Sequence, residues 1–320
     1  AGRRFVADPV QGTAPAWPDP HPDTMTLLGQ RGVRHVGCDS PSMGPLPDLA
    51  EPTHIAGLKF GMIFTEGVTR LNLVKPGSFY CVLAPRHAKG MYGEGRALAI
   101  APGPLANRLI ASATAKRVVE LSVINDSQLP ITWTGPGIGN HRFPYIKIDF
   151  LYAKNLDLQH HTHMMDAHAG THLVPPAYAL PTSNFNNTSY SKQVRGWLAE
   201  YETRFGPRKT SQATTETVPL GQTCGEARVI DVRGLVGTTE KDSWPSSPQI
   251  SVPLVRAYEK AHGPLRAGDC VLFYTGHVGR TFKTLPKGSV CISDPLNGNS
   301  EGWPAVTPEV VVYLGERGIR

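Results

Sequence analysis

The two ends of this 320-residue chain carry the same sequence pattern. Residues 5–34 read FVADPVQGTAPAWPDPHPDTMTLLGQRGVR, and residues 291–320 read CISDPLNGNSEGWPAVTPEVVVYLGERGIR. They align without a gap, so that residue n of the first segment pairs with residue n + 286 of the second. Identical residues recur at matched positions, among them Asp8 and Asp294, Trp17 and Trp303, and Arg31 and Arg317. A repeat this dense indicates a recurring structural unit, which constrains any fold assigned to the chain.

Each copy predicts a short strand, a Pro/Gly turn, and a helix with Pro near its start and an Arg-Gly stop. The first copy runs on into HVGCD at 35–39, which has the pattern of a buried strand, whereas the second ends at Arg320. We therefore expect a window cut from a tandem array, with one complete but circularly permuted unit. On this interpretation residues 1–100 form the C-terminal half of a unit and residues 101–116 a linker. Residues 117–320 form the N-terminal part of a unit, ending in a partial repeat of residues 5–34.

The remaining segments predict strands alternating with single helices, which is typical of an α/β class with a mixed sheet. Strands are expected at VGCD, FYCVLAP, RALAIAP, RVVELSV, ARVIDV and DCVLFYTG. Helices are expected from about His54 to Phe64 and at SKQVRGWLAEYETRF and ISVPLVRAYEKAH.

Composition excludes several classes of protein. No apolar run approaches the length of a membrane helix, and the positive charges behind the net charge of +6 are scattered, so nucleic acid is not an expected partner. A mild positive field suits a small anionic substrate. The five cysteines are far apart and form no CxxC pair, which favours a reducing compartment and hence a cytoplasmic location.

The chemistry-bearing stretch is MDAHAGTHLVPPAY, from Met165 to Tyr178. His168 and His172 stand four apart, but Gly170 and the following Pro175-Pro176 pair argue against a regular helix. We predict a strand leading into a turn with converging imidazoles, a donor set that suits Zn, Mn or Fe. The alternative is a polar turn stabilised by hydrogen bonds of histidine and threonine.

HAGTH, followed by two residues and Pro, resembles the HxGTHxDxPxH signature of the metal-dependent cyclase family. That family includes kynurenine formamidases, isatin hydrolases and some polyketide cyclases. RVVELS, AGDCVLFYTG and VGCDSPS resemble three of its strands, in permuted order. The resemblance implies a mixed-sheet, swivelling β/β/α-like α/β fold, here circularly permuted with a duplicated strand-helix segment at its ends. It also implies that His54 and Glu66, twelve apart, close the metal site.

The signature departs from the family at two positions. Val174 stands where the family has its metal-binding Asp, and Tyr178 stands where it has its last His. Valine has no donor atom and neutral tyrosine is a poor ligand, so we expect one divalent metal per site, Zn or Mn, rather than two. The candidate ligands are His168, His172, His54 and Glu66.

Other residues are candidates for chemistry or substrate binding. Glu66 is a ligand or a general base, and Asp166 is either a substitute carboxylate or base or a turn-capping residue. Tyr178 is kept as a third catalytic candidate. Ser42, Thr171 and His277 are candidates for substrate contact. His160, His161 and His163 form a second patch that either adds a ligand or is solvated and hydrogen-bonded.

Three functions compete. The first is a metal-dependent hydrolase of a small cyclic amide, lactone or N-acyl substrate, which would be anionic or carbonyl-containing. The second is a polyketide-type cyclase or dehydratase. The third is a non-catalytic homologue that has lost its metal site and acts as a structural subunit. The resemblance also implies a homo-oligomer, in which terminal segments are free to exchange between chains.

Overall fold

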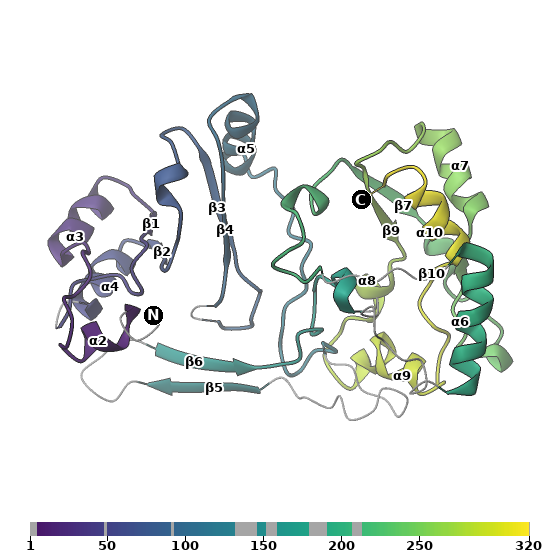
Figure 1. The fold of residues 1–320 in the computed structure, drawn as a ribbon. Helices are drawn as coiled ribbons and strands as arrows, with labels where there is room; N and C mark the ends of the chain where they lie inside the picture. The colour runs from purple at the N-terminus through teal and green to yellow at the C-terminus, as the bar shows by residue number, and fades with distance from the viewer. Residues whose placement is uncertain are drawn as a thin grey trace. The chain divides into compact units, whose positions relative to one another are not determined.

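The computed structural model describes residues 5–47, 50–90, 93–131, 146–151, 159–178, 191–206 and 213–319. The chain divides into two compact units. Unit 1 comprises Ala1–Ile124 and Lys147–His163, and unit 2 comprises Asn125–Ile146 and Met164–Arg320. Helices and strands occur together in both units (Figure 1), so the predicted mixed α/β class is confirmed.

Unit 1 is organised around a parallel strand pair, β1 (His35–Gly37) with β2 (Ile63–Thr65). Helices α3 (Pro22–Gln30) and α4 (Ala50–Leu58) pack together beside it (Figure 1). The core between these elements is built from Met25, Met43, Ala56 and Met62. The other elements are α2 (Ala7–Val10), η1 (Leu71–Leu73), the antiparallel pair β3 (Phe79–Leu83) and β4 (Arg96–Ile100), α5 (Pro104–Thr114), β5 (Ile146–Leu151) and β6 (Gln159–Met164).

A glycine allows the close approach of α3 to the core of unit 1. Gly29 is buried in the last turn of α3, and a Cβ atom placed there would lie 2.3 Å from Cδ2 of Phe60. Since protein cores are close-packed, the aromatic ring occupies the space that a side chain would need.

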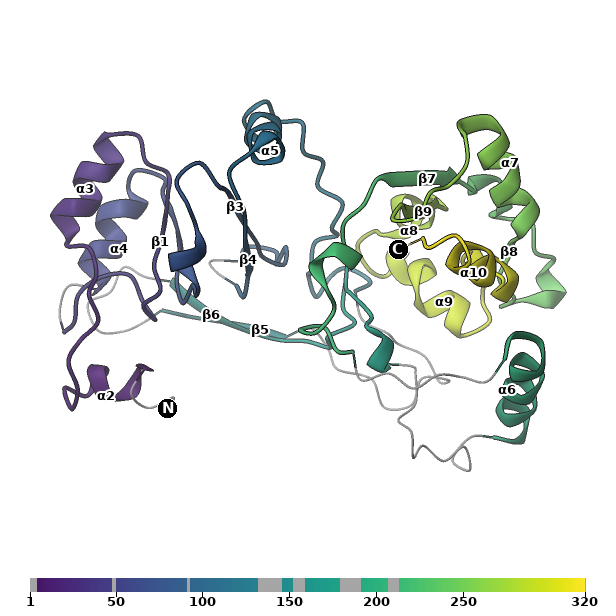
Figure 2. The same cartoon turned by 45° about the horizontal axis from the view of Figure 1, so that its top comes forward.

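Unit 2 is organised around the parallel pair β7 (Ala227–Asp231) and β9 (Cys270–Tyr274). A second short parallel pair joins β8 (Gln249–Ile250) to β10 (Ala305–Val306). Helices α7 (Val252–His262) and α10 (Pro308–Gly315) contact each other (Figure 2). The core comprises Ile230, Val232, Ile250, Val255, Leu265, Val310 and Tyr313. The other elements are η3 (Pro176–Tyr178), α6 (Lys192–Phe205), η5 (Leu220–Gln222), η6 (Arg233–Leu235), η7 (Lys241–Ser243), α8 (His277–Thr281), η8 (Lys287–Cys291) and α9 (Ser293–Leu296).

The two repeat copies form helices at matched positions. Offset by 286 residues, α2 falls on α9, and α3 falls on α10 with the same first residue type, Pro. Gly12 and Gly298 also match, with φ angles of 71° and 74° in the left-handed region that favours glycine. The helix predicted in each copy is therefore confirmed. The circular permutation, the tandem array and the domain boundaries drawn from them stay predictions.

Three sequence-based predictions of secondary structure are wrong. The short strand expected at the start of each copy is a helical turn, α2 or α9, because the Asp-Pro step lacks an amide donor for strand pairing. The helix expected to reach Phe64 ends at Leu58, since Gly61 turns the chain with φ of 69° into β2. The strand expected at RVVELSV is not formed, and its Val118, Val119 and Leu121 side chains are exposed.

The sequence predicted one mixed sheet, but the structure has several small sheets instead. Within the described ranges the strands form five separate two-stranded sheets. Parallel and antiparallel pairs both occur among them.

Two further observations concern the environment of the chain. All five cysteines are free thiols, and only the Cys224 side chain is fully exposed. Among the helices that the structure describes, none is both long enough and apolar enough to span a lipid bilayer.

The close contact at Gly29 predicts a sharp effect of substitution. We expect Gly29→Ala to lower the free energy of unfolding by about 1–3 kcal/mol, because the added methyl group overpacks the core against Phe60. The matched control is Gly315→Ala at the equivalent position of α10, where a Cβ meets no atom within 4 Å. Urea unfolding monitored by circular dichroism measures both, and equal effects would contradict the packing argument.

Candidate functional site

The HAGTH segment is a turn that follows strand β6. The strand ends at Met164, and Gly170 has φ of 64°, so the chain reverses without a helix. Ala169 is buried against Ile131, and the Gly170 amide donates to the Ile131 carbonyl at 3.3 Å. The predicted strand-to-turn conformation is thus confirmed, and its centre packs against Ile131 between the two histidines.

Both imidazoles of the turn are oriented through their Nδ1 atoms. Nδ1 of His168 lies 3.1 Å from Oδ1 of Asp166, and Nδ1 of His172 lies 2.9 Å from the carbonyl oxygen of Gly170. Oxygen acceptors of this kind require a proton on Nδ1. In the neutral rings the lone pair therefore resides on Nε2, the atom available to a metal or a proton.

Asp166 caps the turn, as one of its two predicted roles required, and it also contacts a histidine ring; its role as a substitute ligand or base stays a prediction. Its Oδ1 accepts the backbone N–H of His168 at 2.9 Å, which caps the turn, and the same oxygen contacts the imidazole. A carboxylate behind a histidine fixes its tautomer and raises its basicity as a ligand.

The turn presents two nitrogen donors on neighbouring rings. The ring centroids of His168 and His172 are 5.3 Å apart, and the ring of Tyr178 lies 5.0 Å from that of His168. Across the described ranges, no cluster of three or more His, Cys, Asp or Glu side chains is arranged to hold a metal. The pair supplies two of the three or more protein ligands that a catalytic metal site needs, so other residues must provide the rest.

The other residues predicted around this turn are more dispersed. Val174 and Thr171 are exposed, and Tyr178 ends the 3₁₀ turn η3. His277 begins α8, and its Nε2 lies 2.8 Å from the carbonyl oxygen of Cys291, a contact that holds the loop.

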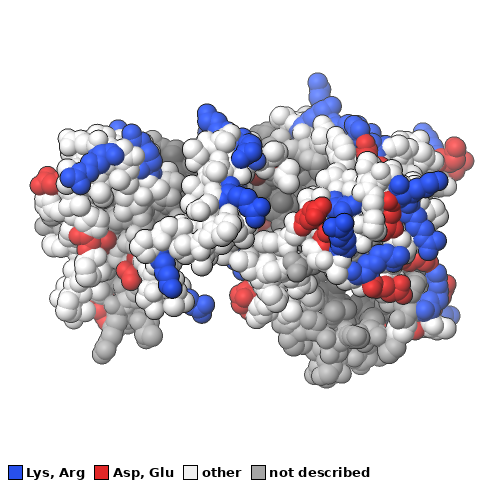
Figure 3. All heavy atoms as spheres, turned by 90° about the horizontal axis from the view of Figure 1, so that it is seen from above, with Lys and Arg blue, Asp and Glu red and all other residues white. Residues whose placement is uncertain are grey.

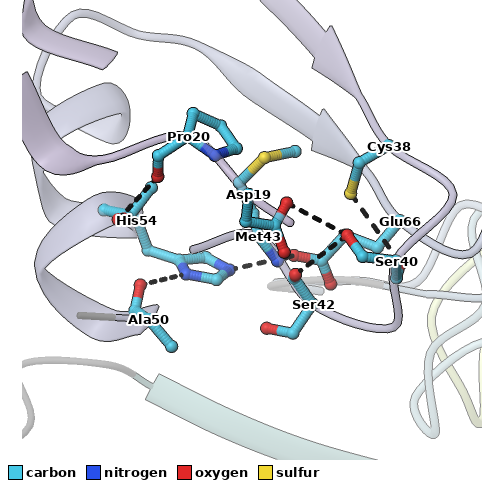
Figure 4. A network of polar contacts seen from close by, with 10 residues as sticks. Asp19, Pro20, Cys38, Ser40, Ser42, Met43, Ala50, His54 and Glu66 are labelled. Carbon is cyan, nitrogen blue, oxygen red and sulfur yellow. Dashed lines mark hydrogen bonds and ion pairs between the residues drawn. The ribbon is translucent and has the colours of Figure 1, made fainter. Parts of the chain in front are cut away.

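Unit 1 holds the second predicted pair, His54 from α4 and Glu66 beyond β2 (Figure 4). Nδ1 of His54 lies 2.8 Å from the Ala50 carbonyl, while Nε2 faces Oε1 of Glu66 at 3.1 Å. Burial lowers the pKa of His54, but the hydrogen bonds with Glu66 and Ala50 outweigh it, so this pKa stands above the ordinary value. The structure sets no distance between this pair and the HAGTH pair, since they lie in different units.

A neighbouring acid was missed by the sequence analysis. Ser40 donates through Oγ to Oδ1 of Asp19 at 3.0 Å, and Oε1 of Glu66 accepts the backbone N–H of Met43 at 2.6 Å (Figure 4). Burial raises the pKa of Asp19, opposed by the bond from Ser40 and assisted by the nearby Glu66 carboxylate. Ser42, the predicted substrate contact, accepts a hydrogen bond from Ser40 through its backbone oxygen. The signal in the sequence was an acid in the WPDP turn.

Two residues of the second predicted histidine patch, His161 and His163, lie in unit 1 with His87, and the side chain of His160 is outside the described part of the chain. The rings of His87 and His163 stack with centroids 4.0 Å apart, and His161 meets His163 edge-on at 4.5 Å. Burial lowers the pKa of both His87 and His163, and mutual repulsion with the neighbouring imidazoles lowers them further. The His161 side chain, at the edge of this stack, is buried. The stacked pair of His87 and His163 therefore favours uncharged rings.

Comparison with known proteins bears on the part of the chain that carries the HAGTH turn. The family model described as "Putative cyclase" matches residues 114–320. A kynurenine formamidase from Salinibacter ruber (strain DSM 13855 / M31) is 38% identical over 91 residues. That alignment covers 27% of this chain and 42% of the formamidase, so the match spans less than half of the relative's length.

Solved isatin hydrolases are similar at low identity. Isatin hydrolase A from Labrenzia aggregata, bound to benzyl benzoate, gives a TM-score of 0.46 at 19% identity, over 67% of this chain and 70% of that one. Isatin hydrolase A from Ralstonia solanacearum gives 0.47 at 19% identity, over 69% and 72%.

The stacked patch predicts acid sensitivity. The folded state holds the pKa of His87 below its unfolded value of about 6.5, so the unfolded state takes up a proton more readily. The free energy of unfolding therefore falls as the pH is lowered through that range. We expect the free energy of unfolding of the parent to fall more between about pH 7.5 and 5.5 than that of His87→Gln. Urea unfolding at both pH values tests this, with His262→Gln in unit 2 as the control. A parent and His87→Gln with the same pH dependence would refute it.

Proposed function

This chain belongs to the putative cyclase family, and from that premise we propose that it is a metal-dependent hydrolase of a small cyclic amide, lactone or N-acyl compound. One observation carries the proposal. In the HAGTH turn both imidazoles have Nδ1 against an oxygen acceptor, which directs the lone pair to Nε2 in each ring. The similarity of part of the chain to a kynurenine formamidase supports hydrolysis of an acylated nitrogen.

The residues of the turn have distinct tasks in this proposal. His168 and His172 hold a divalent metal, Zn or Mn, through Nε2, and Asp166 keeps His168 in the correct tautomer. When bound, such a metal lowers the pKa of water towards neutrality and polarises a carbonyl group. Tyr178, beside the His168 ring, is a donor for the oxygen of the substrate.

Val174 and Tyr178 decide how many metals are held. Neither supplies a carboxylate or an imidazole, so the turn provides ligands for a single ion. His54 and Glu66 remain the predicted source of the missing ligands or of a general base. Within unit 1 their arrangement differs from that of the HAGTH turn, because Nδ1 of His54 lies against a carbonyl and Nε2 already faces the Glu66 carboxylate.

Metal binding is the first prediction of this function. We expect about one equivalent of Zn or Mn per chain after reconstitution, lost in His168→Ala, by elemental analysis. No metal in the parent chain would sink the hydrolase proposal and favour a non-catalytic subunit. Two equivalents would contradict the single-ion site.

The second prediction separates the two roles of Asp166. Asp166→Asn keeps an oxygen for the backbone N–H of His168 but removes the charge behind the ring, so metal affinity should fall roughly 10–100-fold. Asp126→Asn is the matched control, because Oδ1 of Asp126 accepts the amide of Gln128 in the same local geometry without a histidine. Competition with a chromogenic chelator measures both affinities. An equal affinity in the two variants would leave Asp166 as a turn cap alone.

A further inference from the structure

A pocket of unit 2 lies at the C-terminal ends of its main parallel strands. Asp231 and Tyr274 are the last residues of β7 and β9 and face each other in the strand register. The pocket has a volume of about 840 Å³ and is lined by Asp231, Arg233, Gly234, Tyr274, Gly276, Gly279 and Arg280. In open α/β sheets, ligands bind in the crevice outside the carboxyl ends of parallel strands. The position is therefore one where a ligand is expected.

One of the two arginines is neutralised within the pocket. Arg233 donates from Nη2 to Oδ2 of Asp231 at 2.7 Å and from Nε to Oδ1 at 3.0 Å. Hydrogen bonds from Arg233 lower the pKa of Asp231 to about 2, so the carboxylate stays charged. The guanidinium also lies 4.6 Å from the ring centroid of Tyr274. This pair contributes no net charge.

The charge of the second arginine, Arg280, is not compensated by a carboxylate among the described residues. Arg280 donates from Nε to the Gly276 carbonyl at 3.2 Å and from Nη2 to the Thr275 carbonyl at 3.1 Å. Within the described part of the chain, no carboxylate forms an ion pair with it. The two carbonyl contacts hold the guanidinium in place without cancelling its charge. The pocket therefore carries one net positive charge on a fixed planar donor.

Glycines keep the pocket open beside this donor. A Cβ atom at Gly234 or Gly279 would meet no atom within 4 Å, whereas one at Gly276 would lie 3.2 Å from the Arg233 side chain. On the face of unit 2 that Figure 3 shows, acidic and basic side chains are interspersed. The positive charge that the pocket offers to a ligand is therefore that of the Arg280 side chain.

We propose that this pocket binds the carboxylate of a small anionic ligand, with Arg280 as its partner and the Tyr274 ring as the adjacent apolar surface. A planar guanidinium matches a carboxylate in shape and in its two donor directions. A single net positive charge matches one carboxylate better than a doubly charged phosphate. The inference stands apart from the hydrolase proposal, since it concerns binding and no metal.

Calorimetric titration with sodium benzoate tests the inference, with benzamide as the uncharged analogue of the same shape. We expect saturable binding of benzoate that weakens as NaCl is added, because the pocket is open to solvent. Benzamide should bind weakly. Arg280→Ala should weaken benzoate binding roughly tenfold or more. Arg266→Ala removes the same charge from unit 2 outside the pocket lining and should bind benzoate as the parent does.

Two further variants separate loss of the site from loss of the fold or of metal. Gly279→Val keeps both arginines and fills space that is open at that position, so it should also weaken benzoate binding while the circular dichroism spectrum is unchanged. His168→Ala should bind benzoate as the parent does, even when metal and activity are lost. Failure of benzoate to bind, equal binding of benzamide, stronger binding of inorganic phosphate, or full binding by Arg280→Ala would overturn the inference.

Discussion

The parallel pairing of β7 with β9 is the constraint on which the functional part of unit 2 depends. Its register, from Ala227 opposite Cys270 to Asp231 opposite Tyr274, brings two strand ends together that are more than forty residues apart in the chain. Ile230 of β7 joins the core with residues of α7 and α10. Beyond β9, the chain forms α8 and reaches Phe282, which packs against the buried cluster that Ala169 of the HAGTH turn forms with Ile131. One strand pair thus supports both the charged pocket and the turn that carries the metal-binding candidates.

A second physical theme is the control of imidazole tautomers by oxygen. Nδ1 of His54, His168 and His172 each faces an oxygen atom of the protein. Two of these acceptors are main-chain carbonyls, which local turns supply without any long-range contact. In unit 2 this presents His168 and His172 through Nε2, as a metal site requires, whereas Nε2 of His54 in unit 1 faces Oε1 of Glu66. Asp166 places a negative charge behind the His168 ring. Val174 has no donor atom, which reduces the number of ligands that the turn offers to a metal.

The sequence predicted this site as far as local chemistry allowed. The HAGTH turn, its departure from helix and the resemblance to the cyclase family were readable from a few residues, and the family match over residues 114–320 confirms the resemblance. The strand expected at RVVELSV failed because β propensity needs a partner strand, which its pattern does not specify. Asp19, and His87 as the stacking partner of the predicted His163, were missed because their neighbours are distant in sequence.

The sequence by itself determined the helices with Pro at their starts, the two matched terminal copies, the turn between β6 and Pro175, and the family. These depend on backbone restrictions and spacings that act within a few residues. Only the tertiary structure decided which strands pair, which arginine stays uncompensated and which carboxylate lies behind which histidine. Arg233 and Arg280 look equivalent in the sequence, yet one is neutralised by Asp231 and the other donates to the Gly276 and Thr275 carbonyls. The reason is physical: charge compensation and packing depend on distances between side chains, and the fold sets those distances.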